Sequence, residues 1–492
     1  MAAIGLFAGA VAWPEPRLEP ARPASFAIRG VAVVDVVAGV VRTEQTVVVA
    51  DGRIAAVGPR ETVAVPPGLR VVDGRARFVM PALWDMHTHV LAISPLLDMP
   101  LYVASGVTSV RDMQGCPSPG DPFIACGDEK RRWSREAVSG ERVGPRIVET
   151  SSFMANGPGM AARLGDVPAY FDTATPAQAR AFVRHFVGRA DTIKVYDRIP
   201  RDAYLALADE ARLRGMAVVG HRPHAVDAIE AARHQRSLEH ARFLLHESFD
   251  GSQALRERAG SPSWREDRRA MVNRHDPARA REILSAMREA GTFYVPTHLT
   301  RWSDAFAHLP RVREDPVLRY VHPLLQRQWR EDLDELLAEA PGPAARRGYL
   351  DFYRKGLDLT LEAQRAGVRI MVGTDYLAAG VDVHRELEQL VHAGLTPAEA
   401  LRAATVTPAA YAGEASERGQ VLRGMVADLV LLDADPLRDI RNTRRIRGVV
   451  FAGALYDEVA VRAIDSHVAR NARSWTVGAK IIWRFIRNPG AY

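Results

Sequence analysis

The feature that most constrains this chain is a repeated alternation of short apolar runs with stretches rich in Ala, Leu, Arg and Glu. The runs predict strands and the stretches between them predict helices. The strands are the run that ends at His87, then GVTSVRD, GPRIVETSS, DTIKVYD, GMAVVGH, RSLEHAR, GTFYVPTHL and GVRIMVGTD. Eight β/α units predict an α/β fold, a closed TIM-like (β/α)8 barrel whose active site lies at the carboxyl ends of its strands.

Two β-rich segments flank the predicted barrel. Residues 26–80 alternate β-branched runs with Asp51-Gly52 and Asp73-Gly74, which are typical of hairpin turns, and a β pattern returns near Gly424. The N-terminal segment lacks enough strands to bury a core alone. We therefore expect residues 26–80 and 424–465 to form one small β-sandwich, into which the barrel of residues 81–423 is inserted.

Both termini and one loop provide evidence on the cellular compartment of the protein. Residues 1–25 form an N-terminal tail whose first apolar stretch would suit signal-peptide cleavage after Ala12, although no positive residue precedes it. Cys116 and Cys126 share a Gly/Pro-rich loop and are either disulfide-bonded, which needs an oxidising compartment, or two free thiols. Residues 466–492 predict an amphipathic tail that contacts a membrane surface, a neighbouring subunit or its own domain. Together these features favour an exported bacterial enzyme, periplasmic or secreted, over a cytoplasmic one.

The charge pattern argues against a nucleic-acid partner. The chain has 65 Lys and Arg against 59 Asp and Glu, a net charge of +6, and the basic residues are scattered. A nucleic-acid surface would concentrate them on one stripe. We expect a small-molecule substrate and a homo-oligomer.

Candidate metal ligands recur at the predicted strand ends. His87 and His89 are two residues apart in PALWDMHTHV, so on a strand they project from the same face. The later strands end near Lys194, His221 and His240, and the last ends at Asp375. Each residue alone could be structural, a satisfied core histidine or a turn aspartate. Agreement of five strand ends indicates a metal site.

Lys194 is the most discriminating of these residues. Only four lysines occur in the chain, and arginine supplies the other basic side chains. An unpaired ammonium on an inward-facing strand position is costly. A carbamate made from the lysine amine and CO2 is an anionic bidentate ligand, and arginine cannot form it.

This order of residues resembles the amidohydrolase superfamily, in particular its imidazolonepropionase-like and prolidase-like branch. The resemblance extends from PALWDMHTH through LTPAEALRAATVTPAAY to GMVADLVLLDADP. It implies two divalent metal ions, usually zinc: His87 and His89 bind the first, N6-carboxylysine at Lys194 bridges, and His221 and His240 bind the second. Asp375 is implied as both ligand and catalytic proton acceptor. The implied reaction is hydrolysis of an amide or peptide C–N bond by a hydroxide bridging the two metals, with a dipeptide or N-acyl amino acid as substrate.

Two further residues are candidates for substrate binding. Tyr196 shares the inward face of Lys194 and could bind a substrate carboxylate or carbonyl oxygen, or be a barrel-core tyrosine. His298 ends the seventh strand, and we expect it to face the same mouth. Asp85 and Glu239 could orient ligands or pair within the core, and we leave them outside the predicted site. Long connections at residues 113–143, 246–290 and 301–360 are where substrate choice would be made.

Two alternatives remain open. A mononuclear enzyme, either an imidazolonepropionase-like cyclic amide hydrolase or a deaminase, would use the same fold without needing Lys194. A non-catalytic binding protein on the same barrel would be expected to have lost a ligand, and none is missing from the sequence.

Overall fold

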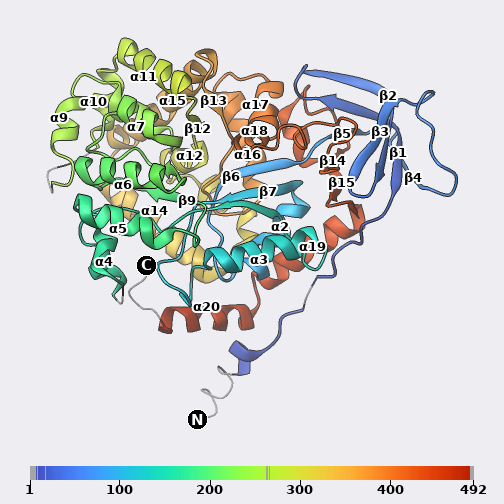
Figure 1. The fold of residues 1–492 in the computed structure, drawn as a ribbon, viewed down its shortest axis with the longest axis horizontal. Helices are drawn as coiled ribbons and strands as arrows, with labels where there is room; N and C mark the ends of the chain where they lie inside the picture. Colours follow the sequence, from blue (N-terminus) through green and yellow to red (C-terminus); the bar gives the residue numbers. More distant parts are fainter. Residues whose placement is uncertain are drawn as a thin grey trace.

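The computed structural model describes residues 7–487 except for residues 8, 17, 166, 262, 263 and 265. The start of the predicted signal stretch, residues 1–6, and the last part of the predicted tail, residues 488–492, lie outside the described residues. Within the described part, the strands form three sheets, and helices surround two of them (Figure 1). The third sheet lies to one side of this helical body (Figure 1).

The predicted barrel strands are all present among the described residues, in two parallel sheets. One sheet has the order β6 (Leu83–Thr88), β7 (Val107–Asp112) and β8 (Arg146–Thr150). The other has the order β13 (Arg369–Ile370), β12 (Phe293–Val295), β11 (Gln235–Glu239), β10 (Ala217–Gly220) and β9 (Thr192–Val195). Every residue of β6, β7 and β9 is buried, as expected of parallel strands with both faces covered.

Backbone hydrogen bonds cross both gaps between these two sheets. At one gap, Met86 N donates to Val372 O over 2.8 Å and Asp375 N donates to His87 O over 3.0 Å. At the other gap, Ser152 N donates to Thr192 O over 2.8 Å. The carboxyl ends of β6 and of the chain after β13 are thereby held side by side, which brings His87 next to Asp375.

Helices cover the outside of the strands and build the long connections. They are α2 (Asp98–Ala104), α3 (Gly127–Val138), α4 (Met160–Leu164), α5 (Pro176–Phe186), α6 (Arg201–Leu213), α7 (Ala228–His234), α8 (Arg242–Glu247), α9 (Ser252–Glu257), α10 (Arg268–Asn273), α11 (Pro277–Ala290), α12 (His298–Phe306), α13 (Pro310–Arg313), α14 (Pro323–Glu339), α15 (Pro343–Arg365), α16 (Val381–His392), α17 (Pro397–Ala403) and α18 (Val406–Tyr411). Short 3-10 turns are η1 (Ser94–Leu96), η2 (Ala169–Asp172), η3 (Pro316–Tyr320) and η4 (Ile440–Arg444). Helix α11 illustrates the local rules, because Asp276 caps its first N–H groups, Pro277 follows, and Gly291 ends it with φ 71°.

The two flanking β segments share one sheet. Its order is β16 (Ala454–Asp457), β15 (Ile446–Phe451), β14 (Leu429–Leu432), β5 (Phe78–Pro81), β1 (Phe26–Asp35), β2 (Val40–Ala50) and β3 (Arg53–Pro59), with β4 (Arg70–Asp73) also on β1. The strands of the predicted sandwich form one continuous sheet, because β5 pairs with both β1 and β14. Ile54 N donates to Met425 O over 2.8 Å, so the sheet folds back over its own core.

Only one of the two predicted hairpin turns is a hairpin. Asp51 and Gly52, with φ 50° and 72°, connect the antiparallel strands β2 and β3. The prediction for Asp73-Gly74 was wrong, because β4 and β5 both run parallel to β1 along the same edge. Glycine is needed there for close approach: a Cβ on Gly74 would lie 2.6 Å from Cβ of Val31.

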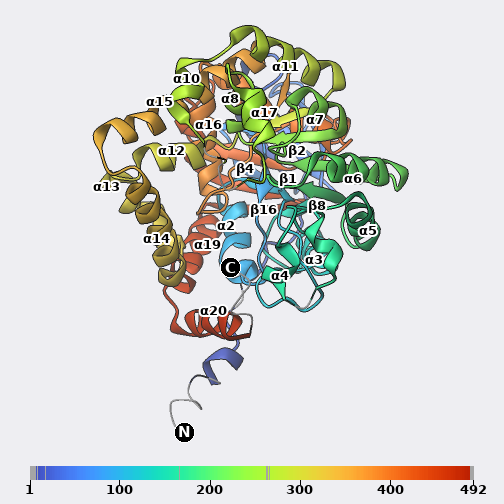
Figure 2. The ribbon, with the colours of Figure 1, turned by 90° about the vertical axis from the view of Figure 1, so that its left-hand side faces the viewer.

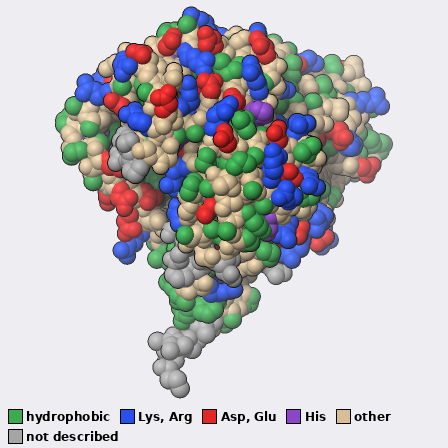
Figure 3. Space-filling view, turned by 60° about the vertical axis from the view of Figure 1, so that its left-hand side comes forward, with side chains coloured by type: hydrophobic (Ala, Val, Ile, Leu, Met, Phe, Trp, Pro, Cys, Tyr) green, Lys and Arg blue, Asp and Glu red, His purple; other side chains and the backbone are tan. Residues whose placement is uncertain are grey.

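The C-terminal segment packs on the helical body. Helix α19 (Glu458–Asn471) crosses the predicted boundary at residue 465, and α20 (Trp475–Arg487) follows. The inner face of α20 packs through Val477 and Ile481, while Trp475 and Ile486 are exposed. Figure 3 shows hydrophobic side chains at the end of the molecule where the N-terminal segment projects. Membrane or subunit contact through this tail stays a prediction. Among the described helices, none combines the length and apolarity that a membrane span requires.

Of the two alternatives for the cysteines, the structure has the disulfide. Cys116 and Cys126 are bonded, with their Cα atoms 4.9 Å apart.

Candidate metal centre

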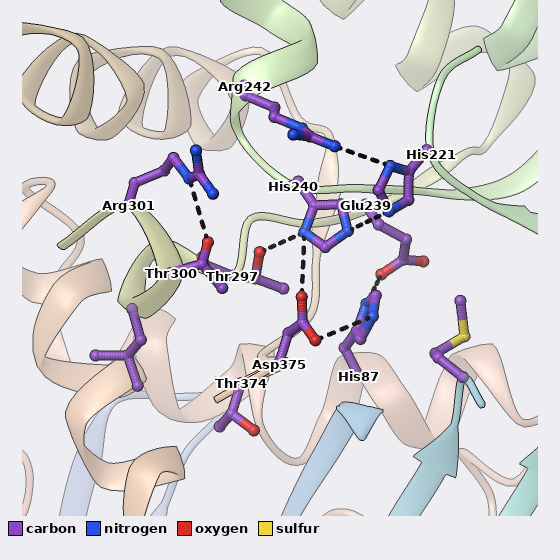
Figure 4. Close-up of polar contacts among 12 residues, drawn as sticks. His87, His221, Glu239, His240, Arg242, Thr297, Thr300, Arg301, Thr374 and Asp375 are labelled. Atoms are coloured by element: carbon purple, nitrogen blue, oxygen red, sulfur yellow. Dashed lines mark hydrogen bonds and ion pairs between the residues drawn. The ribbon is translucent and has the colours of Figure 1, made fainter. Parts of the chain in front are cut away.

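The six predicted metal ligands line one cavity of about 130 Å³. They come from five strands: His87 lies in β6 and His89 just after it, Lys194 lies in β9, and His221, His240 and Asp375 follow β10, β11 and β13. Tyr196, Arg242, Thr300 and Arg301 complete the lining. Figure 4 shows His87, His221, His240 and Asp375 pointing toward one another from different strands. The strand ends therefore converge as the sequence predicted.

The donor atoms are close enough to share metal ions. Asp375 Oδ1 lies 3.5 Å from His89 Nε2 and 3.8 Å from His87 Nε2. One ligand atom from each of these three residues can be chosen so that all lie within 4.8 Å of one another. On the other side of the cavity, Nε2 of His221 and Nε2 of His240 are 2.9 Å apart (Figure 4). Imidazole nitrogens and carboxylate oxygens in this arrangement fit zinc or a similar divalent ion.

The backbone is strained at two of the candidate ligands. His240 has φ 69° and Asp375 has φ 45°, in the left-handed region that side-chain-bearing residues rarely adopt. Such strain persists only where surrounding contacts enforce it, and it concentrates at functional sites. Close packing beside Asp375 depends on Gly373, where a Cβ would lie 2.4 Å from Val295 Cγ1 and 2.7 Å from His87 Cβ.

Buried carboxylates orient the histidine rings from behind. Glu239 Oε2 lies 2.9 Å from His87 Nδ1, and Asp197 Oδ1 lies 2.8 Å from His221 Nδ1. Each contact leaves Nε2 of the histidine facing the cavity. Asp85 accepts hydrogen bonds from the backbone N–H groups of His87 and Thr374. Of the two carboxylates set aside in the sequence, Glu239 thus supports His87 rather than the adjacent His240.

Asp197 was missed in the sequence, although it directly follows Tyr196 at the end of β9. Burial alone would raise the pKa of Asp197, but Arg242 and His221 outweigh burial and hold it well below its usual value. Arg242 Nη2 lies 2.8 Å from Asp197 Oδ2. A strand-end carboxylate beside an inward-facing tyrosine is the signal that could have identified it.

Lys194 lies at the inner wall of the cavity and is 2% exposed. Its Nζ donates to Met113 O over 2.6 Å, and in the described part of the chain no carboxylate forms an ion pair with it. Burial lowers the pKa of the Lys194 amine. The Lys194 amine thus lies at the cavity with a backbone carbonyl as its hydrogen-bond acceptor.

The two substrate-binding candidates have different outcomes. Tyr196 lines the cavity with its ring centroid 3.9 Å from that of His221. His298 does not line it. The helix α12 begins at His298, and the buried ring turns into the helical layer, where Nε2 lies 2.9 Å from Thr360 Oγ1. The expectation that His298 faces the mouth was therefore wrong, because the strand β12 ends at Val295 and the chain has already turned.

Two arginines at the cavity were not predicted. Arg242 stands two residues after His240, and Arg301 belongs to the helical connection after β12 (Figure 4). Arg301 Nη1 also pairs with Asp304 Oδ2 over 2.8 Å. The position of Arg242 after a strand-end histidine was a usable signal, whereas nothing in the sequence distinguishes Arg301 from its many neighbouring arginines.

Parallel strands surrounded by helices, with histidine, lysine and aspartate at their carboxyl ends, define the class: this is a TIM-like metal-dependent hydrolase fold. A family model matches residues 78–455, and the chain belongs to the amidohydrolase family.

Three known proteins show how far the similarity extends. A 68-residue segment is 44% identical to adenine deaminase of Paracoccus denitrificans (strain Pd 1222), and it spans 14% of this chain and only 11% of that relative. Bottromycin amidohydrolase has a TM-score of 0.65 at 23% identity, covering 92% of this chain and 91% of its own. A Xaa-Pro dipeptidase with methionine bound in its active site has a TM-score of 0.60 at 20% identity, covering 88% and 100%. These two structures establish likeness of the fold.

Proposed function

We propose that this protein is a metal-dependent amidohydrolase of the prolidase-like kind that hydrolyses an amide or peptide C–N bond. The observation that carries the proposal is the convergence of six metal-type side chains from five strand ends on one cavity. Structural histidines have no reason to gather at the carboxyl ends of parallel strands, where catalysis takes place in this class of fold.

Two divalent ions, most often zinc in such donor sets, are proposed to occupy the cavity. His87 and His89 would hold the first and His221 and His240 the second, with Asp375 as a further ligand and N6-carboxylysine at Lys194 as the bridge. When bound, such ions supply Lewis-acid chemistry, lowering the pKa of a water molecule and polarising a carbonyl group. The lowered pKa of the Lys194 amine supports the carbamate, because the neutral amine is the form that reacts with CO2.

The protein's own residues have distinct tasks in this proposal. Burial lowers the pKa of His221 and of His240, so both rings are neutral near pH 7 and keep a lone pair for a metal. Burial would raise the pKa of Asp375, but neighbouring His87, His89 and Lys194 lower it overall, so its carboxylate is ionised. In this proposal, Asp375 takes a proton from the attacking water and delivers it to the leaving nitrogen.

Two arginines and a tyrosine in the cavity lining support a substrate that bears a carboxylate. Arg242 and Arg301 both reach the cavity, and Tyr196 lies between Lys194 and His221. Guanidinium groups bind carboxylates through paired, charge-assisted hydrogen bonds. A dipeptide or an N-acyl amino acid would place its carboxylate against these arginines and its amide at Asp375.

A second candidate function is a mononuclear deaminase or cyclic amide hydrolase. It is favoured by the tight group of His87, His89 and Asp375, which could hold one ion alone, and by the partial match to an adenine deaminase. It assigns no role to Lys194.

Metal content per chain separates the two candidates. We expect about two ions in protein purified without chelator and one or none in Lys194→Ala. Lys355→Ala, which removes a lysine from α15 away from the cavity, is the matched control and is expected to keep both ions. Protein prepared in carbon-13 bicarbonate should show a carbamate signal that only Lys194→Ala abolishes. One ion in all three proteins would overturn the binuclear proposal in favour of the mononuclear one.

Three wider proposals accompany this function. The hydrogen bonds across both gaps between the parallel sheets support a closed eight-stranded ring. The Cys116–Cys126 disulfide supports an exported enzyme, because disulfides persist in oxidising compartments. Assembly as a homo-oligomer is proposed without a specific surface.

A further inference from the structure

A second cavity, of about 350 Å³, lies beside the metal centre. The two cavities share His89 and Asp375, so a molecule whose reacting bond lies at Asp375 has access to both. A volume of a few hundred Å³ is typical of small-molecule sites. Arg242 and Arg301 line the smaller cavity, whereas no described arginine lines the larger one.

The walls of this second cavity are mainly apolar and aromatic. They come from three parts of the chain and include Leu97, Tyr102, Leu325, Trp329, Tyr376 and Leu377. Besides Asp375, the carboxylate of Asp98 reaches the lining, but Ser94 Oγ donates to its Oδ2 over 2.8 Å. Arginine and lysine side chains are absent from the described lining. Apolar surface of this kind favours a neutral, apolar group over a charged one.

The C-terminal helix α20 supports both walls of this cavity. On one side, Val477 and Ile481 pack in one cluster with Ile93 and Leu97. On the other side, α20 lines a groove together with α14, which carries Leu325 and Trp329, and Figure 2 shows α14 extending from α13 toward α20.

Close contact at one position of α20 reinforces this arrangement. A Cβ on Gly478 would lie 3.0 Å from Nε2 of His322, the residue that caps α14 and lines the cavity. The N-terminal end of α14 thus packs directly on α20.

We propose that this second cavity binds a large apolar group of the substrate, an aromatic or medium-length alkyl acyl group, on the opposite side of the scissile bond from the carboxylate. This inference rests on the proposed function and narrows its substrate class to N-acyl amino acids with bulky apolar acyl groups. Small acyl groups such as acetyl leave most of the cavity unfilled and gain little from it.

Two neighbouring leucines of α14 allow a matched test. Leu325 lines the cavity, whereas Leu324 lies on the outer side of α14, in a groove shared with Ile482 and Ile486. Leu325→Trp fills the cavity, and Leu324→Trp makes the same change outside it. Trp329→Ala is a second variant that removes a wall, so the test does not depend on one protein folding correctly.

The first readout is calorimetric binding of butanoate, hexanoate and octanoate to the metal-loaded enzyme. The acids share one carboxylate and differ only in their tails. For the natural sequence we expect binding roughly fourfold tighter for each methylene that the cavity buries. Leu325→Trp and Trp329→Ala should each weaken octanoate much more than butanoate, and Leu324→Trp should match the natural sequence.

The second readout is hydrolysis of N-butanoylglycine and N-octanoylglycine, which separates this inference from the proposed function. Tail-dependent binding without amide hydrolysis would support the cavity and overturn the proposed function. Hydrolysis at a rate independent of acyl length would overturn this inference and leave the proposed function standing. Binding of the acids with an affinity independent of tail length would also overturn this inference. An equal response of Leu325→Trp and Leu324→Trp would also overturn it.

Discussion

The Oε2 atom of Glu239 lies 2.9 Å from Nδ1 of His87, and both side chains are buried. A carboxylate at Nδ1 selects the tautomer with the proton on that nitrogen and leaves Nε2 free to bind a metal. Arg111 holds the other oxygen of Glu239 over 2.7 Å, which fixes the carboxylate itself. The orientation of the His87 ring is therefore set by Glu239, and the position of Glu239 is set by Arg111.

Replacing this carboxylate should weaken metal binding without touching a ligand. We expect Glu239→Gln to lower affinity by about 10- to 100-fold, as is usual for such supporting residues. Chelator competition measures the change. Glu149→Gln is the control, because Glu149 accepts from Tyr411 Oη over 2.8 Å in the same buried network but contacts no candidate ligand. An equal loss of metal affinity in Glu239→Gln and Glu149→Gln would mean that the total charge of the buried network, and not the orientation of His87, controls metal affinity.

Glu386 should make stability depend on pH. Its carboxyl accepts hydrogen bonds from the backbone N–H groups of His298 and Leu299, and burial raises its pKa from 4.5 to about 8. Between these values the unfolded chain is ionised while the folded chain keeps the proton. The unfolded state then binds fewer protons, so the free energy of unfolding falls as pH rises, by at most roughly 1.4 kcal/mol per unit.

Glu386→Gln removes this titration while keeping a carbonyl acceptor. Relative to the natural sequence, the variant should gain thermal stability as the pH is raised from about 5 to about 8. Thermal unfolding at several pH values measures the gain. A constant difference in midpoint across that window would show that Glu386 is ionised in the folded protein.

The disulfide should stabilise the loop that supports the C-terminal helix. Phe123, between the cysteines, packs on Phe485 of α20 with ring centroids 4.6 Å apart. For a loop closed over a sequence separation of 10, removing the bond should cost about 3 kcal/mol. Cys116→Ser with Cys126→Ser should lower the unfolding midpoint, and a reductant should lower only that of the natural sequence. Proteolysis should then begin within residues 116–126. An unchanged midpoint in both experiments would mean that packing alone holds the loop.

Much of this architecture could be predicted from the sequence because the strand periodicity is strong and local. The barrel strands, and the meeting of the candidate ligands at their ends, follow from where the apolar runs stop. His298 shows the limit of that argument. One residue of left-handed backbone at Thr297, with φ 47°, directs the chain into α12, and no sequence pattern marks such a turn.

Other features depend on contacts distant in sequence. Gly74 permits β4 and β5 to lie along one edge of β1, which a local turn pattern could not distinguish from a hairpin. The apolar cavity joins residues near Leu97 with others near Leu325 and Tyr376, and only the fold brings these three segments together. Domain limits, metal number and site roles remain predictions.

The two buried lysines, Lys130 and Lys194, should respond oppositely to removal. Lys130 Nζ pairs with Asp112 Oδ2 over 2.8 Å, and both groups are buried. Lys130→Met would leave a buried carboxylate unpaired and should destabilise the metal-free protein by about 3 to 5 kcal/mol. For Lys194, Met113 O is the hydrogen-bond acceptor that the described structure provides. Burying its charge is costly, so Lys194→Met should leave the metal-free protein equally stable or more stable.

Denaturant unfolding of chelator-treated protein tests this contrast, and metal analysis completes it. A buried lysine that lowers stability is expected to have a functional role, here metal binding through its amine. Lys194→Met should therefore lose metal while keeping the fold. Comparable destabilisation by both substitutions would instead make Lys194 a structural residue. The outcome would then favour the mononuclear alternative, since the bridge would have no chemical role.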